Sequence, residues 1–194
     1  MTTVEPCPAL SIREGVTVVL DGRQLELHRC FTVTLGLVRV GASRQEEDAH
    51  QAHPITLGFL QAGDQLAPGQ LWNKRLHLQA LADSRLEASA RVPQAIDGNS
   101  LQDWTLEMLL IRNLHDAEQR ISALLQLLVR HFGRRHGPWV ELSLPMTHAD
   151  LAELCGHTRV TVSRQFSRWR EQGLLEQEAS PRRLLRLAPE LVDP

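Results

Sequence analysis

Residues 146–175 read MTHADLAELCGHTRVTVSRQFSRWREQGLL, and this stretch decides the fold of the C-terminal part of the chain. Thr147 followed by Asp150 is a variant of the capping box that begins a helix. Gly156 is the residue type that ends a helix in the left-handed conformation, and Thr158 can cap a second one. The stretch therefore predicts two short helices joined by a tight turn.

The second predicted helix has an apolar side and a basic side. Val162, Phe166 and Trp169 recur at i, i+4 and i+7, which predicts one buried stripe. No acidic residue lies between Glu153 and Glu171. The polar side carries Arg159, Ser163, Arg164 and Arg168. A short helix that is buried on one side and basic on the other suits the major groove of DNA.

Three small or apolar residues fall at the spacings of a helix-turn-helix. Ala152 lets the second helix cross closely, Gly156 turns the chain, and Val162 fills the gap between the helices. The alternative is an ordinary helical hairpin whose arginine side is simply solvated. The turn and the segregated charge together favour the DNA-binding motif.

The composition is that of a globular protein. The chain has 194 residues, is 42% hydrophobic and has a formal net charge of −2, so the DNA hypothesis rests on where the arginines lie. It shows no membrane-spanning run and no signal peptide, which predicts a cytoplasmic protein. Cys7, Cys30 and Cys155 are odd in number and far apart, which argues against a disulfide framework and an iron–sulfur cluster.

The N-terminal half reads as a series of short strands, which predicts an antiparallel sandwich or barrel and an α+β protein overall. A turn at Asp21-Gly22 separates two β-rich runs. Residues 30–40, CFTVTLGLVRV, read as one long strand with a bend or bulge at Gly36. Further strands are predicted at residues 54–60, 75–81 and 84–90.

Residues 100–114 predict a helix that is apolar on more than one face, so it needs two partners. One partner is the β domain, and the other could be the same helix of a second subunit. We therefore expect Trp104, Met108, Ile111 and neighbouring leucines to form a two-fold helix pair.

The next helix is predicted to be capped by Asp116, with Gln119 as the reciprocal partner, and to end at Phe132-Gly133. Its buried face is predicted to comprise Ile121, Leu124, Leu125, Leu128 and Val129. Residues 139–144 predict a short strand. After Gly173 the sequence predicts a hairpin with a turn at Ser180-Pro181, which would be the wing of a winged helix.

Residues 116–188 resemble the DNA-binding domain of the Crp/Fnr family of bacterial transcription regulators, through DAEQRISALLQLLVRHFG and the 146–175 stretch. The segment TRVTVSR, residues 158–164, resembles most closely the cyanobacterial global nitrogen regulator branch. TLGLVRV and LGFLQAGDQL resemble the family's β-roll sensor, which is jelly-roll-like. The resemblance implies a shortened β-roll over residues 1–99, a dimerisation helix over 100–115 and a winged helix-turn-helix over 116–194.

The resemblance also implies a homodimer that binds a palindromic DNA site and contacts RNA polymerase. Arg159 and Arg164 match the arginines that reach base edges. Val160 stands where cyclic-AMP receptor proteins have Glu, and it could touch a thymine methyl group instead. Further candidates for phosphate or base contacts are Thr158, Thr161, Ser163, Arg168, His148, Arg182 and Arg183.

The cyclic-nucleotide site of the family is not recognisable. After Leu66 the chain runs APGQLWNKRLHLQAL, with neither the Gly-Glu segment nor the Arg-Ser or Arg-Thr pair that holds the cyclic phosphate. We therefore predict no cyclic-AMP binding, no cofactor and no metal, and the sequence leaves the effector unknown.

Other side-chain groups are weaker candidates. His50 and His53 lie near Glu46, Glu47 and Asp48; a solvated loop is the better interpretation than a metal site. His28 and Cys30 fit a strand histidine beside a buried thiol, and His131 and His136 fit a helix end. Two alternatives stay open: a small-ligand or metal sensor whose winged helix serves protein contacts, and an enzyme with a cupin-like barrel, although no nucleophile–base pair is recognisable.

Overall fold

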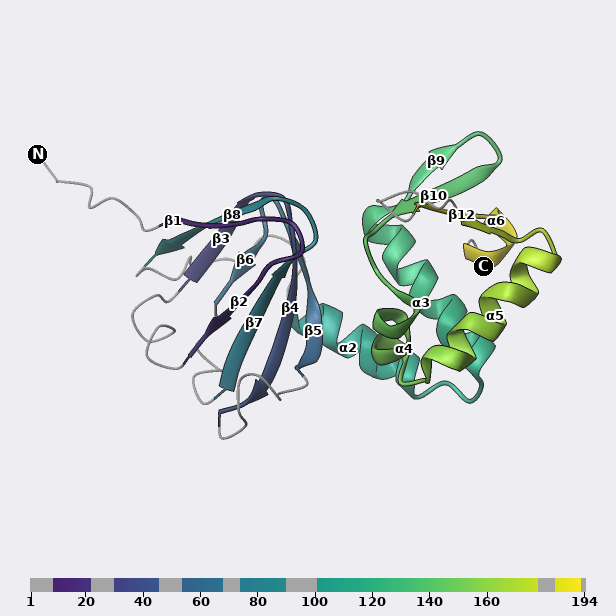
Figure 1. The fold of residues 1–194 in the computed structure, drawn as a ribbon, viewed down its shortest axis with the longest axis horizontal. Coiled ribbons are helices and arrows are strands. Elements are labelled where there is room, and N and C mark those ends of the chain that lie inside the picture. Colours follow the sequence, from purple (N-terminus) through teal and green to yellow (C-terminus); the bar gives the residue numbers. More distant parts are fainter. Residues whose placement is uncertain are drawn as a thin grey trace, which may run out of the picture. The chain divides into compact units, whose positions relative to one another are not determined.

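The computed structural model describes residues 9–21, 30–45, 54–67, 74–89, 101–177 and 184–192. The chain divides into two compact units, Met1–Thr105 and Leu106–Pro194. The boundary between them falls inside the helix α2 (Leu101–Arg112) (Figure 1). The first unit is therefore the β domain with the start of α2, and the second is the winged helix with the end of α2.

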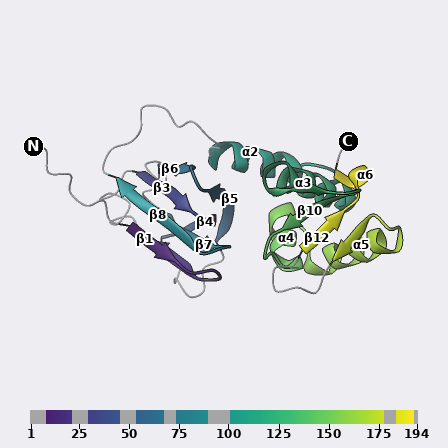
Figure 2. The ribbon, with the colours of Figure 1, turned by 90° about the horizontal axis from the view of Figure 1, so that it is seen from above.

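The first unit contains two four-stranded antiparallel sheets (Figures 1 and 2). One sheet has the order β1 (Ala9–Ile12), β8 (Ser84–Ser89), β3 (Cys30–Leu35) and β6 (Gln65–Leu66). The other has the order β2 (Thr17–Leu20), β7 (Lys74–Ala80), β4 (Leu37–Arg44) and β5 (Ile55–Gln61). The predicted antiparallel β fold is confirmed.

An apolar core fills the first unit, because alternate residues of each strand share one face. Val38 and Val40 of β4 are fully buried, and they pair in register with Ala80 and Leu78 of β7. Each fully buried side chain of this size stabilises the fold by about 1.5–3 kcal/mol. The other core residues include Ile12, Phe31, Val33, Leu60, Leu66, Leu76 and Leu86.

The prediction of one long strand over residues 30–40 is wrong. Gly36 separates β3 from β4, and these two strands belong to different sheets. Its φ is +88°, and a Cβ there would lie 2.3 Å from Ser84 Oγ and 2.4 Å from the carbonyl oxygen of Asp83. Only glycine fits this position, so the residue expected to bend a strand instead carries the chain between sheets.

The beginning of α2 packs on β5. The Trp104 ring lies 5.1 Å from the Phe59 ring in an edge-to-face arrangement, and Thr105 Oγ1 donates to the carbonyl of Leu57 at 2.9 Å. A Cβ on Gly58 would approach Trp104 Cβ to 2.5 Å, so the glycine makes room for the helix. The prediction that the β domain is one partner of this helix is confirmed.

The second unit continues with α3 (Ala117–Phe132), α4 (His148–Cys155) and α5 (Arg159–Glu171). A small antiparallel sheet has the order β11 (Leu175–Gln177), β12 (Leu184–Leu187), β10 (Trp139–Ser143) and β9 (Arg134–His136). The short helix α6 (Pro189–Val192) follows. Asp116 caps α3 by accepting from the backbone N–H of Gln119 at 2.8 Å, as predicted.

His136 does not lie at a helix end, and that prediction is wrong. The helix α3 ends at Phe132, and His136 belongs to β9, where it pairs with Trp139 of β10. Gly137, with φ +59°, forms the turn between these strands. His131 does lie in the last turn of α3, as predicted.

Several predicted features lie outside the described residues. They are Cys7, Gly22 of the Asp21-Gly22 turn, His28, Glu46, Glu47, Asp48, His50, His53, the Ser180-Pro181 turn, Arg182 and Arg183. Within the described ranges, no group of three or more His, Cys, Asp or Glu side chains could hold a metal ion. None of the helices in those ranges is both long and apolar enough to cross a membrane.

Candidate nucleic-acid interface

The two helices α4 and α5 form the predicted helix-turn-helix. The capping box of α4 is reciprocal: Thr147 N–H donates to Asp150 Oδ2 at 2.6 Å, and Asp150 N–H donates to Thr147 Oγ1 at 3.1 Å. Gly156 ends α4 with φ +70°, and the next N–H, of His157, donates to the carbonyl of Ala152 at 2.8 Å. The predicted cap, turn residue and helix order are all confirmed.

The helix α5 is fixed by its cap and by its buried stripe. Thr158 Oγ1 accepts from the Thr161 N–H at 3.2 Å. Val162 and Phe166 are fully buried and Trp169 is 1% exposed, as the spacing predicts. Gln165 is also buried, at 7% exposure, although it lies outside the predicted stripe. The cap and the buried stripe therefore fix where α5 begins and which of its sides faces the core.

The opposite side of α5 presents the predicted DNA-reading residues. Arg159 and Arg164 are exposed, and neither forms an ion pair within the part of the chain that the structure describes. Between them along the chain, the apolar Val160 side chain is 56% exposed. One short helix therefore exposes two cations and an aliphatic side chain. These are the groups that can contact the base edges and the thymine methyl groups in the major groove of DNA.

Two of the predicted contact residues bind each other. His148 Nδ1 lies 2.8 Å from Ser163 Oγ, and the imidazole ring lies 4.7 Å from the ring of Phe166. This pair joins the first turn of α4 to the middle of α5. The two side chains therefore help to set the angle between the helices, whatever they contact beyond the protein.

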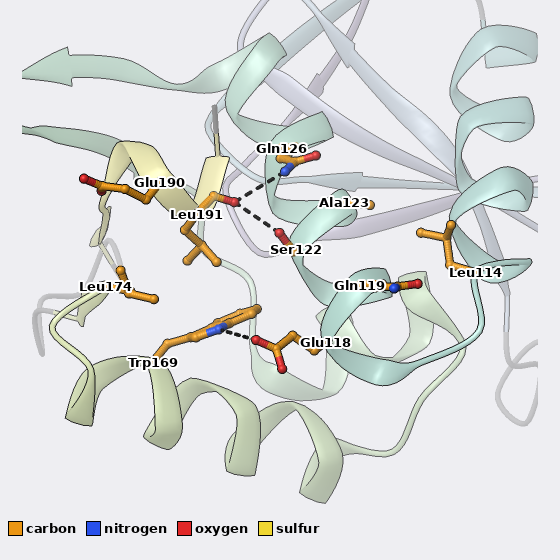
Figure 3. Close-up of a pocket in the computed structure, with 10 residues that line it drawn as sticks. All are labelled: Leu114, Glu118, Gln119, Ser122, Ala123, Gln126, Trp169, Leu174, Glu190 and Leu191. Atoms are coloured by element: carbon orange, nitrogen blue, oxygen red, sulfur yellow. Dashed lines mark hydrogen bonds between the residues drawn. The ribbon is translucent and has the colours of Figure 1, made fainter. Parts of the chain in front are cut away.

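Arg168 is held by an acid from another helix. Its Nη1 atom lies 3.7 Å from Glu118 Oε2 of α3, and Glu118 Oε1 accepts from the Trp169 indole N–H at 3.3 Å. Glu118 and Trp169 line a cavity of about 470 Å³ between α3, the end of α5 and α6. Figure 3 shows these two side chains and the hydrogen bond between them. Ser122 Oγ closes one side by donating to the Leu191 carbonyl at 3.1 Å.

The predicted dimer residues are enclosed within a single copy. Trp104 is 2% exposed, and Met108 and Ile111 are each 5% exposed. The exposed apolar residues of the same helix are Leu106, Leu109 and Leu110, at 56–59%. If α2 pairs with a second copy, these leucines supply the contact and the three predicted residues support it from inside.

Polar contacts that the sequence does not predict involve Arg112, Glu118 and Glu141 of this unit. Arg112, at the end of α2, bonds the carbonyls of Glu153 and Leu154 in α4. Glu118 bonds Trp169, as described above. Glu141 accepts from Arg186 Nε at 3.1 Å and lies 3.0 Å from His136 Nδ1, and these contacts lower the pKa of the Glu141 carboxyl. Apart from the His136–Glu141 contact, these contacts join residues 41 to 51 positions apart, so no local pattern marks them.

Comparison with known proteins supports the assignment of the second unit. Residues 119–190 match the family described as the Crp-like helix-turn-helix domain. Electron transport regulator A of Shewanella oneidensis is 36% identical over 70 residues, which are 36% of this chain and 28% of that protein. Regulatory protein CysR of Synechococcus elongatus is 28% identical over 154 residues, which are 74% of this chain and 69% of that protein.

Solved structures extend the similarity to the whole fold. A Crp/Fnr family transcriptional regulator of Thermus thermophilus is 20% identical, with a TM-score of 0.64 over 96% of this chain and 99% of that one. A mutant of CooA from Carboxydothermus hydrogenoformans is 21% identical, with a TM-score of 0.67 over 94% of this chain and 84% of that one. The chain therefore carries a Crp-like helix-turn-helix domain at residues 119–190, and its whole fold, with the antiparallel β domain in front, is similar to that of solved Crp/Fnr family regulators.

Proposed function

We propose that this protein is a sequence-specific regulator of transcription that acts in the cytoplasm as a homodimer on a palindromic DNA site. The observation that carries the proposal is the exposed side of α5. Arg159, Val160 and Arg164 are exposed on a helix whose opposite stripe is buried. The capped turn between α4 and α5 holds this helix as a fixed unit.

Arg159 and Arg164 are the residues that read sequence in this proposal. A guanidinium can donate two hydrogen bonds to O6 and N7 of guanine, which is the commonest specific contact in the major groove. Val160 contributes an apolar contact to a thymine methyl group. Thr158 and Thr161 at the start of α5, with Arg182 and Arg183 from the segment that the sequence predicts as the wing, contact phosphate and fix the register.

The dimer forms through the exposed leucines of α2. Leu106, Leu109 and Leu110 follow the i, i+3, i+4 spacing of one helix face, and each is more than half exposed. Burying about half of three leucine side chains on each copy favours association. Two-fold symmetry of the protein then selects two inverted half-sites, and the DNA-bound dimer acts on RNA polymerase.

The regulator does not respond to cyclic AMP in this proposal. Residues 67–81 carry neither of the two pairs that hold the cyclic phosphate, although residues 68–73 lie outside the described part of the chain. Calorimetry with cyclic AMP is expected to show no saturable heat. A micromolar dissociation constant would show that other residues of the β domain build a phosphate site.

The decisive experiment is selection of bound sequences from random DNA, followed by titration of the selected site at two salt concentrations. We expect enrichment of an inverted repeat, with affinity that falls as salt rises because bound phosphates release counterions. If no sequence is enriched, or if the affinity does not depend on salt concentration, the proposed sequence-specific DNA binding is wrong. Either result would favour a winged helix that contacts protein.

A further inference from the structure

Arg112 reaches from the last residue of α2 to the end of α4. Its Nε–H donates to the carbonyl of Leu154 at 3.0 Å, and its Nη2 donates to the carbonyl of Glu153 at 2.5 Å. Carbonyls in the last turn of a helix have no partner within that helix. Since α4 has no basic residue in its own last turn, the cation that complements its negative end comes from α2.

The arginine also lies along the turn of the helix-turn-helix. A Cβ placed on Gly156 would lie 3.6 Å from Arg112 Cγ and 3.8 Å from its Cδ, so the arginine stem passes against the left-handed turn residue. Both acceptors are backbone atoms, and the two donors belong to one planar fork. The contact therefore fixes the end of α4, and through the turn the start of α5, with respect to α2.

The same stretch of α2 carries the exposed leucines. Leu106, Leu109 and Leu110 precede Arg112 by two to six residues on one helix. We propose that Arg112 is a positioning residue that locks the recognition helix to the dimer axis and thereby sets the half-site spacing the regulator accepts. This inference rests on the proposed dimeric DNA-binding function.

The physical consequence is a rigid distance between the two recognition helices. Each base pair added between half-sites moves them apart by about 3.4 Å and rotates them by about 35°. A dimer in which α2, α4 and α5 move together cannot follow such a change. Without the arginine fork, the last turn of α4 loses two hydrogen bonds, and the reading helix can adjust to other spacings.

The test measures binding of the full chain to a single half-site, to the selected palindrome, and to palindromes one or two base pairs longer or shorter. We expect the wild-type protein to lose about tenfold in affinity when one base pair is added or removed. Arg112→Ala should bind the single half-site within about twofold of wild type, yet show a nearly flat dependence on spacing. Arg112→Lys should be intermediate, because an ammonium group cannot reproduce the fork.

Arg134→Ala is the matched control, since Arg134 is an exposed arginine of the same unit that lies on β9. It should keep the wild-type spacing preference. An Arg112→Ala protein that still prefers one spacing overturns the proposal for Arg112 alone. Loss of half-site binding in both Arg112 variants also overturns it, because the residue would then hold the domain together. A wild-type protein without site preference contradicts the proposed function itself.

Discussion

The carboxylate of Glu118 accepts the indole N–H of Trp169 at 3.3 Å, and this bond ties α3 to the buried side of the recognition helix. The other carboxylate oxygen lies 3.7 Å from Arg168 on the exposed side. One acid therefore anchors α5 and also restrains a cation that could otherwise reach a DNA phosphate. A substitution that removes the charge of Glu118 but keeps an acceptor oxygen should separate the anchoring of α5 from the restraint on Arg168.

Glu118→Gln keeps an acceptor for Trp169 and removes the ion pair with Arg168. We expect stability to change by less than about 1 kcal/mol, because exposed pairs contribute little. Affinity for all DNA sequences should rise, and the salt dependence should steepen by about one phosphate contact. The control is Glu171→Gln, which removes an exposed acid from α5, the helix that carries Arg168. Equal salt slopes for the two variants would show that Glu118 does not restrain Arg168.

Arg159→Ala and Arg164→Ala should each cost about 1–3 kcal/mol of binding and relax the preference for one G·C pair per half-site. The residues are five positions apart, or about 140° around the helix axis, so each is expected to read a different base pair. Val160→Ala should cost less, since a methyl contact is weaker than a bidentate one. Binding to single-base mismatches checks this, with Arg170→Ala, which bonds Ser167 at 3.0 Å, as control. If Arg159→Ala and Arg164→Ala both keep the wild-type base preference, α5 is not the helix that reads the DNA sequence.

Leu109→Glu should convert the dimer to a monomer without unfolding either unit. A carboxylate forced into the α2 interface costs about 3–5 kcal/mol when it finds no partner, which raises the dissociation constant by about a hundredfold or more. Sedimentation at micromolar concentration measures this directly. Leu35→Glu is the matched control, because Leu35 in the β domain and Leu109 are both 59% exposed. Dimers that persist in Leu109→Glu would place the interface elsewhere.

His77 should make stability fall in mild acid. Its side chain is 6% exposed with Nε2 2.9 Å from Ser43 Oγ, and burial, with the nearby charge of Arg75, lowers its pKa below 6.5. Between the lowered pKa and 6.5 the unfolded chain binds more protons than the folded one. The contribution of neutral His77 to the free energy of unfolding is therefore complete above pH 6.5. It is lost as the pH falls through the pKa of His77 in the folded protein.

The measurement is chemical unfolding between pH 7.5 and 5.5. His77→Gln should unfold with a smaller pH dependence than wild type. Burial and Arg120 lower the pKa of His157 in the same direction, so part of the dependence remains in the second unit. An identical pH slope in wild type and His77→Gln would contradict this explanation.

The helix-turn-helix was predictable because its determinants are local. Thr147 and Asp150, or Thr158 and Thr161, meet within one helical turn, and the buried stripe of α5 follows from helical periodicity alone. The local sequence pattern gave a wrong prediction where contacts with distant segments determine the structure. Gly36 reads as a bend until Ser84, 48 residues later, is seen to occupy the space of its missing side chain.

The same limit applies to the candidate site. An apolar helix can be recognised from sequence, but its pattern does not say which side its own chain covers, so Trp104 was expected at the surface between subunits. Arg112 and Glu118 look like ordinary surface charges, and their partners lie 41 to 51 residues away. Such contacts depend on how helices cross, which the order of residue types does not encode locally.

The pairing of the first strands with the last ones has a consequence for synthesis on the ribosome. Ile12 of β1 pairs with Ser84 of β8, and Leu20 of β2 pairs with Leu76 of β7. Ser84 follows Ile12 by 72 positions, so at about 5–20 residues per second it emerges roughly 4–15 s later. During that interval β1 and β2 are nascent strands without partners, open to pairing with neighbouring chains on a polysome. The N-terminal strands, rather than the winged helix, should therefore determine how much of the newly made protein escapes aggregation.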